Sequence, residues 1–511
     1  MVVMFSAWLS PRCVAQDCDD DSTLVGWLGV PGPNRVYADA NALPNGVNYL
    51  PAPPDTTAAK FIDDFAQWQW GKDVRPTNRG AQASRESQYG LNRLVIIMSQ
   101  VLKVSMTGTR TPKMITLIYQ VGETGSKSTQ KAKLNYQRRR PFEQMGEHTW
   151  GMYDDEDELR GNGSYPSAHS AFGWAVGLVL AEMFPNFQDT ILSRAFQYGE
   201  SRVIVGAHWQ SDVEAARLTA AAAVAHMHRS PQFLTDFEAA RQEYYTVRGI
   251  SPFDVSDVGL PDGKRFLEQP INESSPRFFA DIAQYWQAKT ERDGERGAQA
   301  IDDAACTTPE SLLETFGTAT GERYTEELRP ALYDVVRLSQ SALVEAAEQL
   351  SAQSPVRPRP FVRVGEPPLM TTDSATTAAS CYPSVDATVA WGVALLLAEI
   401  MPEHQEAVLK RGHEMGRSRE IAGYAYASDV QAGRALASAV VARLHAMPEF
   451  ALVLANACTE HDTDPLVTPV QDLLEQSAAF PDGWFSITGQ QLGEEPTEKG
   501  IYIHAGQKVV K

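Results

Sequence analysis

The stretch SYPSAHSAFGWAVGLVLAEMFP, residues 164–185, decides the fold. A short turn with proline and serine leads into an apolar run at residues 171–184, in which alanine and leucine recur at helical spacing. The run has 14 residues and contains Glu182, whereas a membrane span requires roughly 20 apolar residues. We therefore predict a buried core helix and no membrane span, here and in the similar run at residues 388–401.

Three short blocks supply the residue types that phosphate chemistry requires. They are KLNYQRRRP at residues 133–141, YPSAH at residues 165–169 and SRVIVGAHWQSD at residues 201–212. Metal-free hydrolysis of a phosphate monoester requires cations around the dianion, one imidazole that attacks phosphorus and a second that protonates the leaving oxygen. His208 and Asp212 are four residues apart, so on a helix they share a face and the carboxylate can orient the ring.

In this order and with these gaps, the blocks resemble the type 2 phosphatidic acid phosphatase superfamily, and within it the bacterial class A non-specific acid phosphatases. The resemblance extends from about Tyr49 to about Tyr245. It implies that five groups bind the phosphate oxygens: Lys133, Arg140, Ser167, the backbone N–H of Ala168, and Arg202. It also implies three catalytic residues: His208 as the nucleophile that forms a phosphohistidine, Asp212 as the carboxylate that orients it, and His169 as the general acid.

One residue departs from the family pattern, because Ala168 stands where the family usually has glycine. A methyl group there would strain the backbone if the site needs a positive φ, so we expect reduced or narrowed activity. No HExxH, Cys/His cluster or Asp-rich loop accompanies the blocks. The sequence therefore predicts no catalytic metal and no cofactor.

Other polar residues near the blocks have a plainer interpretation. Arg138 and Arg139 are interpreted as solvated neighbours of the phosphate-binding residues. The acidic run at residues 154–158 is interpreted as a solvated loop, with repulsion of polyanions as the alternative. Four histidines in helical stretches are interpreted as packed or surface residues: His226, His228, His404 and His445.

The chain repeats itself without the reacting groups. CYPSVDATVAWGVALLLAEIMP at residues 381–402 matches the opening stretch, and the offset is constant, since 386 minus 169 and 419 minus 202 both give 217. The second copy keeps five polar residues: Arg359, Ser384, Ser418, Arg419 and Asp429. It has Asp386 for His169, Ala425 for His208 and Ala352 for Lys133, so we predict that it does not turn over. We interpret it as a pseudo-domain kept for packing, with ligand sensing or substrate recruitment as the alternative, and expect it to form an internal pseudo-dimer with the first copy.

The predicted fold class is all-α, with two tandem acid-phosphatase/haloperoxidase-like helical bundles and a small β tail at the C-terminus. The predicted divisions are an incomplete signal peptide at residues 1–15, a catalytic domain at 16–247, a degenerate repeat at 265–462 and a tail at 463–511. The tail resembles the sorting tails of type IX secreted proteins. We therefore expect a periplasmic, secreted or cell-envelope location. Four cysteines are expected to form two disulfides or to remain thiols: Cys18, Cys306, Cys381 and Cys458.

The formal charge of −19 argues against binding nucleic acid through a basic surface. The predicted function is a phosphomonoesterase of the acid phosphatase type, acting on small soluble phosphate esters. Two alternatives remain at this stage. One is a vanadium-dependent haloperoxidase, which shares the phosphate pocket, and the other is a non-catalytic protein that binds phosphate esters.

Overall fold

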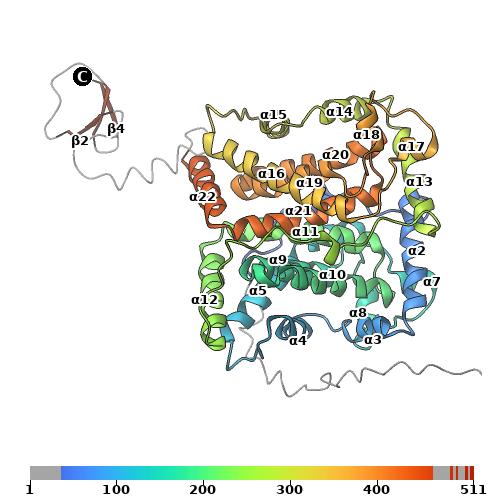
Figure 1. Cartoon of the computed structure of the whole chain (residues 1–511). Helices are drawn as coiled ribbons and strands as arrows, with labels where there is room; N and C mark the ends of the chain where they lie inside the picture. The colour runs from blue at the N-terminus through green and yellow to red at the C-terminus, as the bar shows by residue number, and fades with distance from the viewer. Residues whose placement is uncertain (1–35, 464–483, 487–490, 493–500, 505–506, 511) are drawn as a thin grey trace, which may run out of the picture.

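The structure of the protein is a computed structural model that describes residues 36–463 and, at the C-terminus, residues 484–486, 491–492, 501–504 and 507–510. Its main body consists of helices in two tiers (Figure 1). We call them the first bundle, residues 36–248, and the second bundle, residues 263–463. The predicted signal peptide at residues 1–15, with Cys13 and Cys18, lies outside the described residues.

The first bundle surrounds one buried helix, α9 (Ala168–Met183), in which every residue after Ala168 is buried. Helices α5, α10 and α11 pack against it. The contact with α5 is close because Gly122 faces the Phe172 ring, where a Cβ atom would lie 2.3 Å from Cζ. The other elements of this bundle are α1 (Gly46–Tyr49), α2 (Ala59–Val74), α3 (Asn78–Arg85), α4 (Leu91–Leu102), α5 (Pro112–Lys127), α6 (Gln130–Tyr136), α7 (Pro141–Met145), α8 (Glu156–Arg160), η1 (Pro185–Phe187), α10 (Gln188–Ile204), α11 (Gln210–His228) and α12 (Pro231–Arg248).

The second bundle is arranged in the same way around α19 (Val385–Ile400), which is buried from Ala387 onward. Helices α16, α20 and α21 pack against it. Its other elements are η2 (Gly263–Arg265), α13 (Pro276–Lys289), α14 (Glu295–Ala304), α15 (Pro309–Thr320), α16 (Pro330–Gln353), α17 (Pro360–Val364), α18 (Ser374–Ala378), η3 (Pro402–His404), α20 (Gln405–Ala422), α21 (Ala427–His445) and α22 (Pro448–Asp462). The predicted all-α fold and the two predicted buried helices are thus confirmed.

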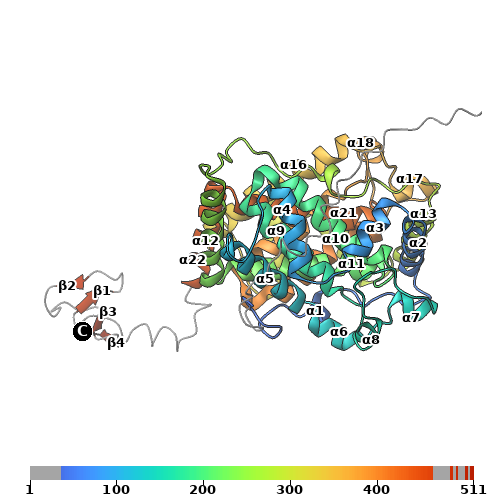
Figure 2. The ribbon, with the colours of Figure 1, turned by 90° about the horizontal axis from the view of Figure 1, so that it is seen from below.

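A small antiparallel sheet follows the bundles near the C-terminus (Figure 2). Its strands are β1 (Trp484–Ser486), β2 (Gln491–Leu492), β3 (Ile501–His504) and β4 (Gln507–Val510), in the order β2-β1-β3-β4. These strands agree with the predicted β tail. Its role as a sorting signal stays a prediction.

Two expectations about individual features can be compared with the described residues. None of the helices within these residues is by itself long and apolar enough to span a membrane; α21 and α22 pass that test only together, as a pair bent by 94°. Cys306, Cys381 and Cys458 are free thiols. Two disulfides among the four candidate cysteines would have to join two of these three, so the thiol alternative holds.

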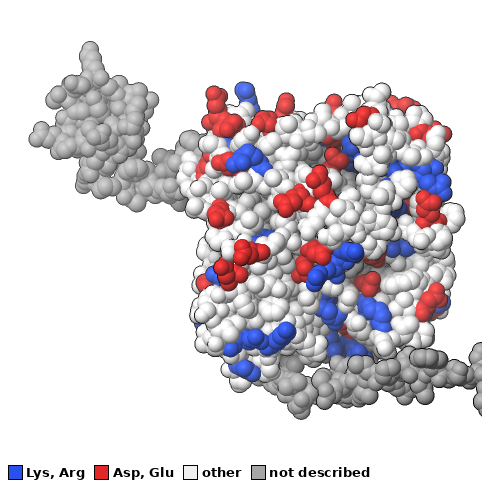
Figure 3. Space-filling view, in the orientation of Figure 1, with Lys and Arg blue, Asp and Glu red and all other residues white. Residues whose placement is uncertain are grey.

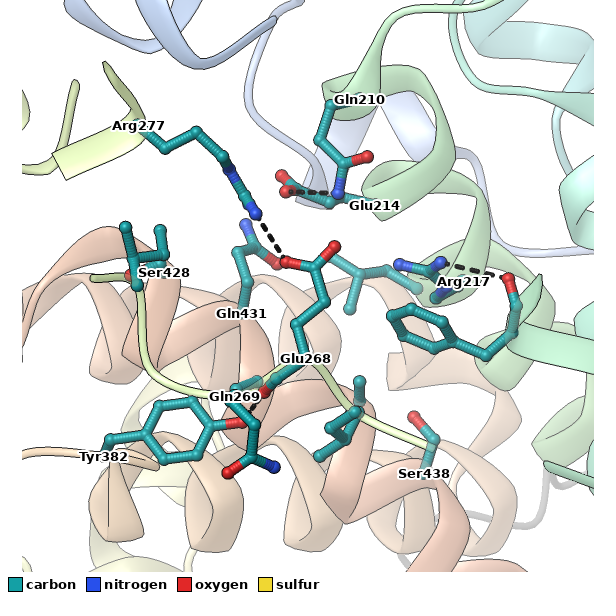
Figure 4. Close-up of a pocket in the computed structure, with 16 residues that line it drawn as sticks. Gln210, Glu214, Arg217, Glu268, Gln269, Arg277, Tyr382, Ser428, Gln431 and Ser438 are labelled. Atoms are coloured by element: carbon teal, nitrogen blue, oxygen red, sulfur yellow. Dashed lines mark hydrogen bonds and ion pairs between the residues drawn. The ribbon is translucent and has the colours of Figure 1, made fainter. Parts of the chain in front are cut away.

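Charged side chains are interspersed on the molecular face shown in Figure 3, where no continuous basic surface appears. Charged groups also join the two bundles. Arg277 of α13 donates from Nε to Asp63 of α2 at 2.8 Å and from Nη1 to Glu268 at 2.7 Å. Figure 4 shows this arginine beside a pocket between the bundles, where Gln210 and Glu214 of α11 lie opposite it.

Replacing the bridging arginine should weaken the junction. We expect Arg277→Ala to lower the free energy of unfolding by about 2 kcal/mol, because Asp63 and Glu268 both lose a charge-assisted hydrogen bond. Urea unfolding measures this change. The control is Arg363→Ala, whose ion pair with Glu273 is about half exposed and should contribute less than about 1 kcal/mol. Equal losses in the two variants would contradict the structural role of Arg277.

Candidate active site

The three sequence blocks meet where α9 and α11 begin. Ser167 caps α9, since its hydroxyl accepts a hydrogen bond from the Ser170 N–H at 3.2 Å. The Ser167 N–H donates to the backbone carbonyl of Asp212 at 3.0 Å, which ties the first turn of α9 to that of α11. His169 and Asp212 are therefore placed by two helix N-termini that are bonded to each other.

The tautomer of His208 follows from its neighbours. Nε2 lies 2.9 Å from Nη1 of Arg140, and a guanidinium can only donate, so Nε2 presents its lone pair. The proton is then on Nδ1, which lies 3.4 Å from Oδ2 of Asp212, at an ion-pair distance but without good hydrogen-bond geometry. Burial, followed by the charge of Arg140, holds the pKa of His208 well below its usual value. The ring is therefore neutral, and its Nε2 lone pair faces Arg140.

Asp212 is fixed from two sides. It accepts from the Trp209 N–H at 2.8 Å and from Nη1 of Arg138 at 2.7 Å, and the same guanidinium donates from Nη2 to Asp64 at 2.7 Å. Burial raises the pKa of Asp212, but Arg138, His208 and the Trp209 N–H together outweigh it and lower the pKa below its usual range. The prediction that Arg138 is a solvated neighbour is wrong, because its side chain is only 8% exposed. Arg139 is exposed, as predicted.

Three cations predicted to bind phosphate converge on this point. Lys133, Arg140 and Arg202 are 6%, 2% and 2% exposed. Burial and then the charge of Arg140 hold the pKa of Lys133 well below its usual value. Burial and then Arg202 lower the pKa of Arg140 to about 10. Like charges that repel one another in a buried space favour an anion among them.

One carboxylate already lies against this cluster. Asp154 accepts from Nη2 of Arg202 at 2.8 Å, and both side chains are 3% exposed. The pair is incompletely satisfied, because Oδ2 of Asp154 and Nε of Arg202 are buried without a hydrogen-bond partner. The prediction that the run is solvated holds for Asp155, Asp157 and Glu158, which are exposed, but the last two lie in the short helix α8 and not in a loop. It is wrong for Asp154.

His169 lies in the first turn of α9 with its ring stacked on Tyr198, at a centroid distance of 4.2 Å. Its pKa is held well below the usual value by burial first, then by the charges of Arg202 and His208. Nε2 is buried and has no hydrogen-bond partner among the residues that the structure describes. This nitrogen is therefore available to a substrate.

The comparisons with known proteins agree with this geometry. The sequence profile described as PAP2 superfamily matches residues 94–236. The non-specific acid phosphatase of Providencia stuartii is 37% identical over 213 residues, which are 86% of that protein and 42% of this chain. The chain belongs to the PAP2 superfamily.

Two other relatives support the same assignment. The non-specific acid phosphatase of Salmonella typhimurium is 33% identical over 200 residues, 80% of that protein and 39% of this chain. The acid phosphatase of Zymomonas mobilis is 30% identical over 200 residues, 75% of that protein and 39% of this chain. The family and the enzyme class that the three blocks predicted, acid phosphatase, are thereby confirmed.

The alanine that departs from the usual pattern of this family causes no backbone strain. Ala168 is the first residue of α9, and the non-glycine residues with positive φ in the described chain are Lys103 and Gln137. A methyl group is tolerated at a helical position, so the mechanism suggested for reduced activity is wrong. Reduced or narrowed activity itself stays a prediction.

The corresponding place in the second bundle keeps the buried arginine–aspartate contacts but lacks the two histidines. Arg357 bonds Asp281 and Asp429 as Arg138 bonds Asp64 and Asp212. Asp386 forms an ion pair with Arg419 at 3.0 Å. With alanine at 425, Asp429 has no imidazole beside it, and burial raises its pKa to about 6 although Arg357 opposes this.

Removing the carboxylate beside Arg202 should strengthen phosphate binding. We expect Asp154→Asn to lower the inhibition constant of inorganic phosphate by about threefold to tenfold, a change of about 1 kcal/mol, because a competing anion is lost. Inhibition of p-nitrophenyl phosphate turnover measures it, with the exposed Glu158→Gln as control. Unchanged or weaker inhibition would show that Asp154 positions Arg202 rather than competing for it.

Proposed function

We propose that this protein hydrolyses small, soluble phosphate monoesters through a phosphohistidine on His208, without a catalytic metal. The contact that carries the proposal is the 2.9 Å approach of Arg140 Nη1 to His208 Nε2. It directs the lone pair of a neutral imidazole to the place where three buried cations would bind the phosphate. The same residues were predicted from the sequence blocks.

In the first step, His208 Nε2 attacks phosphorus and the P–O bond to the leaving group breaks. His169 donates its proton to the leaving oxygen, so the alcohol departs neutral. Its pKa is low in the empty site because of burial, Arg202 and His208. A bound dianion raises that pKa, so protonation of His169 accompanies substrate binding.

In the second step, water attacks the phosphohistidine and gives a proton to His169, which returns the site to its starting charge. The phosphorylated ring keeps its Nδ1–H and carries a positive charge, which Asp212 stabilises from 3.4 Å. Arg140, Arg202 and Lys133 stabilise the transferring group in both steps. Ser167 and the N–H of Ala168, at the start of α9, are placed to add hydrogen bonds.

A vanadium-dependent haloperoxidase is the less supported alternative. The relatives that match the chain are named acid phosphatases. The alternative of a protein that only binds phosphate esters is also less supported, because His208 and His169 are both present at the positions described above.

We propose further that the second bundle takes the place of a second subunit. Helix α9 contacts α21, and α11 contacts α19, as a two-fold arrangement requires. Two pockets between the bundles have corresponding linings: Lys60, Tyr165 and Arg434 in one, and Arg277, Tyr382 and Arg217 in the other. Each pair is separated by 217 positions, the offset of the sequence repeat.

The proposed location is the periplasm, the exterior or the cell envelope. It rests on the signal-like start and on the resemblance of the C-terminal residues to sorting tails.

Replacing His208 and replacing His169 should lower the rate in ways that depend differently on the leaving group of the substrate. We expect His208→Ala to lose about 10⁴-fold or more in kcat with any ester, since both steps pass through it. His169→Ala should slow the phosphorylation step by about 10²–10⁴-fold with an alkyl phosphate and much less with p-nitrophenyl phosphate, whose leaving group needs no proton, while hydrolysis of the phosphohistidine slows equally with both esters. His148→Ala, with a side chain 91% exposed, is the control. Equal sensitivity to the leaving group in both variants would contradict the assigned roles.

Arg138 and Arg139 provide a matched test of whether the contacts of Arg138 with Asp64 and Asp212 support catalysis. Arg138→Gln should lower kcat by about tenfold to a hundredfold, because Asp212 and the His208 ring lose their position. Arg139→Gln should leave kcat unchanged, since Arg139 is exposed. KM should change less than kcat in Arg138→Gln, because Arg138 donates to Asp64 and Asp212 and not to the phosphate. A large change in KM with an unchanged kcat would place Arg138 among the substrate-binding residues instead.

A further inference from the structure

A second cluster of polar side chains is buried between the bundles, far from the phosphate site. It lies where four core helices end: Glu182 of α9, His228 of α11, Glu399 of α19 and His445 of α21. Their side chains are between 5% and 9% exposed. From Asp212 to His228 the α11 helix runs 16 residues, which is about 24 Å.

The four residues form a two-fold set. Nε2 of His228 lies 3.0 Å from Oε2 of Glu182, and Nε2 of His445 lies 2.9 Å from Oε2 of Glu399. The two imidazole rings are 4.1 Å apart between centroids. One ligand atom each from His228, Glu399 and His445 lies within 4.8 Å of the others. Since 445 minus 228 and 399 minus 182 both give 217, each half of the cluster comes from one copy of the repeat.

The other nitrogen of each ring is already occupied. Nδ1 of His228 lies 2.9 Å from the Val224 carbonyl, and Nδ1 of His445 lies 2.9 Å from the Val441 carbonyl. A carbonyl only accepts, so each Nδ1 carries its proton and each Nε2 is the nitrogen that faces the carboxylates. Metal-binding histidines are commonly oriented in this way, with the distal N–H donated to a backbone carbonyl.

Without a cation, the cluster must hold two protons. Each Nε2 to carboxylate contact needs one hydrogen, because a bare nitrogen and a bare carboxylate oxygen would repel. These two protons are held in one small apolar space lined by Leu178 and Leu395, where the ring centroids are 4.1 Å apart. A single divalent cation can replace both protons.

We propose that Glu182, His228, Glu399 and His445 bind one Zn²⁺ and that this structural site joins the two bundles. Two imidazoles and two carboxylates are a donor set that suits zinc in tetrahedral geometry. Ligand atoms about 2.0–2.1 Å from the metal lie about 3.4 Å apart, so small movements suffice for His228, Glu399 and His445, and Glu182 must turn inward from its contact with His228 to complete the site. The four protein ligands leave no position open for a substrate, so the site holds the fold together and takes no part in catalysis. This assignment replaces the interpretation of His228 and His445 as merely packed residues.

The proposal is tested on the full-length chain without a histidine tag, first stripped with a chelator. We expect calorimetric titration with Zn²⁺ to give one tight site per chain. Repeating the titration in buffers of different ionisation enthalpy should show about two protons released per metal, because ligands must be deprotonated to bind. Zinc should also raise the melting temperature of the chain, since it binds only the folded state.

Variants locate the site. The double variant His228→Gln/His445→Gln should lose the tight site and the zinc-dependent rise in melting temperature. His461→Gln should keep both, because His461 pairs with Glu403 at 2.7 Å outside the cluster. A stripped protein that binds no zinc, or a folded double variant that still binds one equivalent, would overturn the proposal.

If the double variant does not fold, the proposal can be tested on the wild-type chain alone. Loaded with Co²⁺ in place of zinc, the proposed site should give the intense visible absorption of a tetrahedral complex, together with the release of about two protons. The weak spectrum of an octahedral complex, or binding without proton release, would indicate surface carboxylates and would overturn the proposal.

Discussion

The structure depends on the burial of three like charges in one place. Lys133, Arg140 and Arg202 are almost fully buried, and burial first, then repulsion from a neighbouring arginine, lowers the pKa of Lys133 and of Arg140. Backbone carbonyls around Arg140, and the carboxylates of Asp212 and Asp154, offset only part of this charge. In the mechanism proposed above, a phosphate dianion supplies the rest, so the unfavourable charge of the empty site becomes binding energy for the substrate.

The buried arginine–aspartate pairs that position this cluster do not depend on the residues proposed to react with phosphate. Arg138 joins α2 to the start of α11 through Asp64 and Asp212, and Arg357 does the same in the second bundle through Asp281 and Asp429. Removing one partner of such a buried pair costs about 3–5 kcal/mol. Replacing a nucleophilic histidine by alanine, in contrast, leaves the buried ion pair intact. The second bundle can therefore lose its reacting groups and still fold and pack against the first.

The sequence predicted the features that depend on local pattern. The buried helix at residues 171–184, the three blocks and the replacement of both histidines in the second copy are all read from spacing and residue type. It did not predict Arg138 as an anchor or Asp154 as a partner of Arg202. Their partners are 74 and 48 positions away, and only the packed chain shows which charge meets which. For the same reason His228 and His445 looked like isolated helix residues, since 217 positions separate them.

The most direct test of the account is to identify which residue carries phosphate during turnover. The protein is mixed with p-nitrophenyl phosphate, quenched in alkali after milliseconds, digested and examined by mass spectrometry. The account predicts one phosphoryl group per chain at most, on His208, with none on the second bundle. A phosphoryl group on another residue would contradict it. The account would also be contradicted if the protein turned over substrate but a rapid quench found no phosphorylated enzyme, even in the His169→Ala variant, in which hydrolysis of the phosphohistidine should be slower.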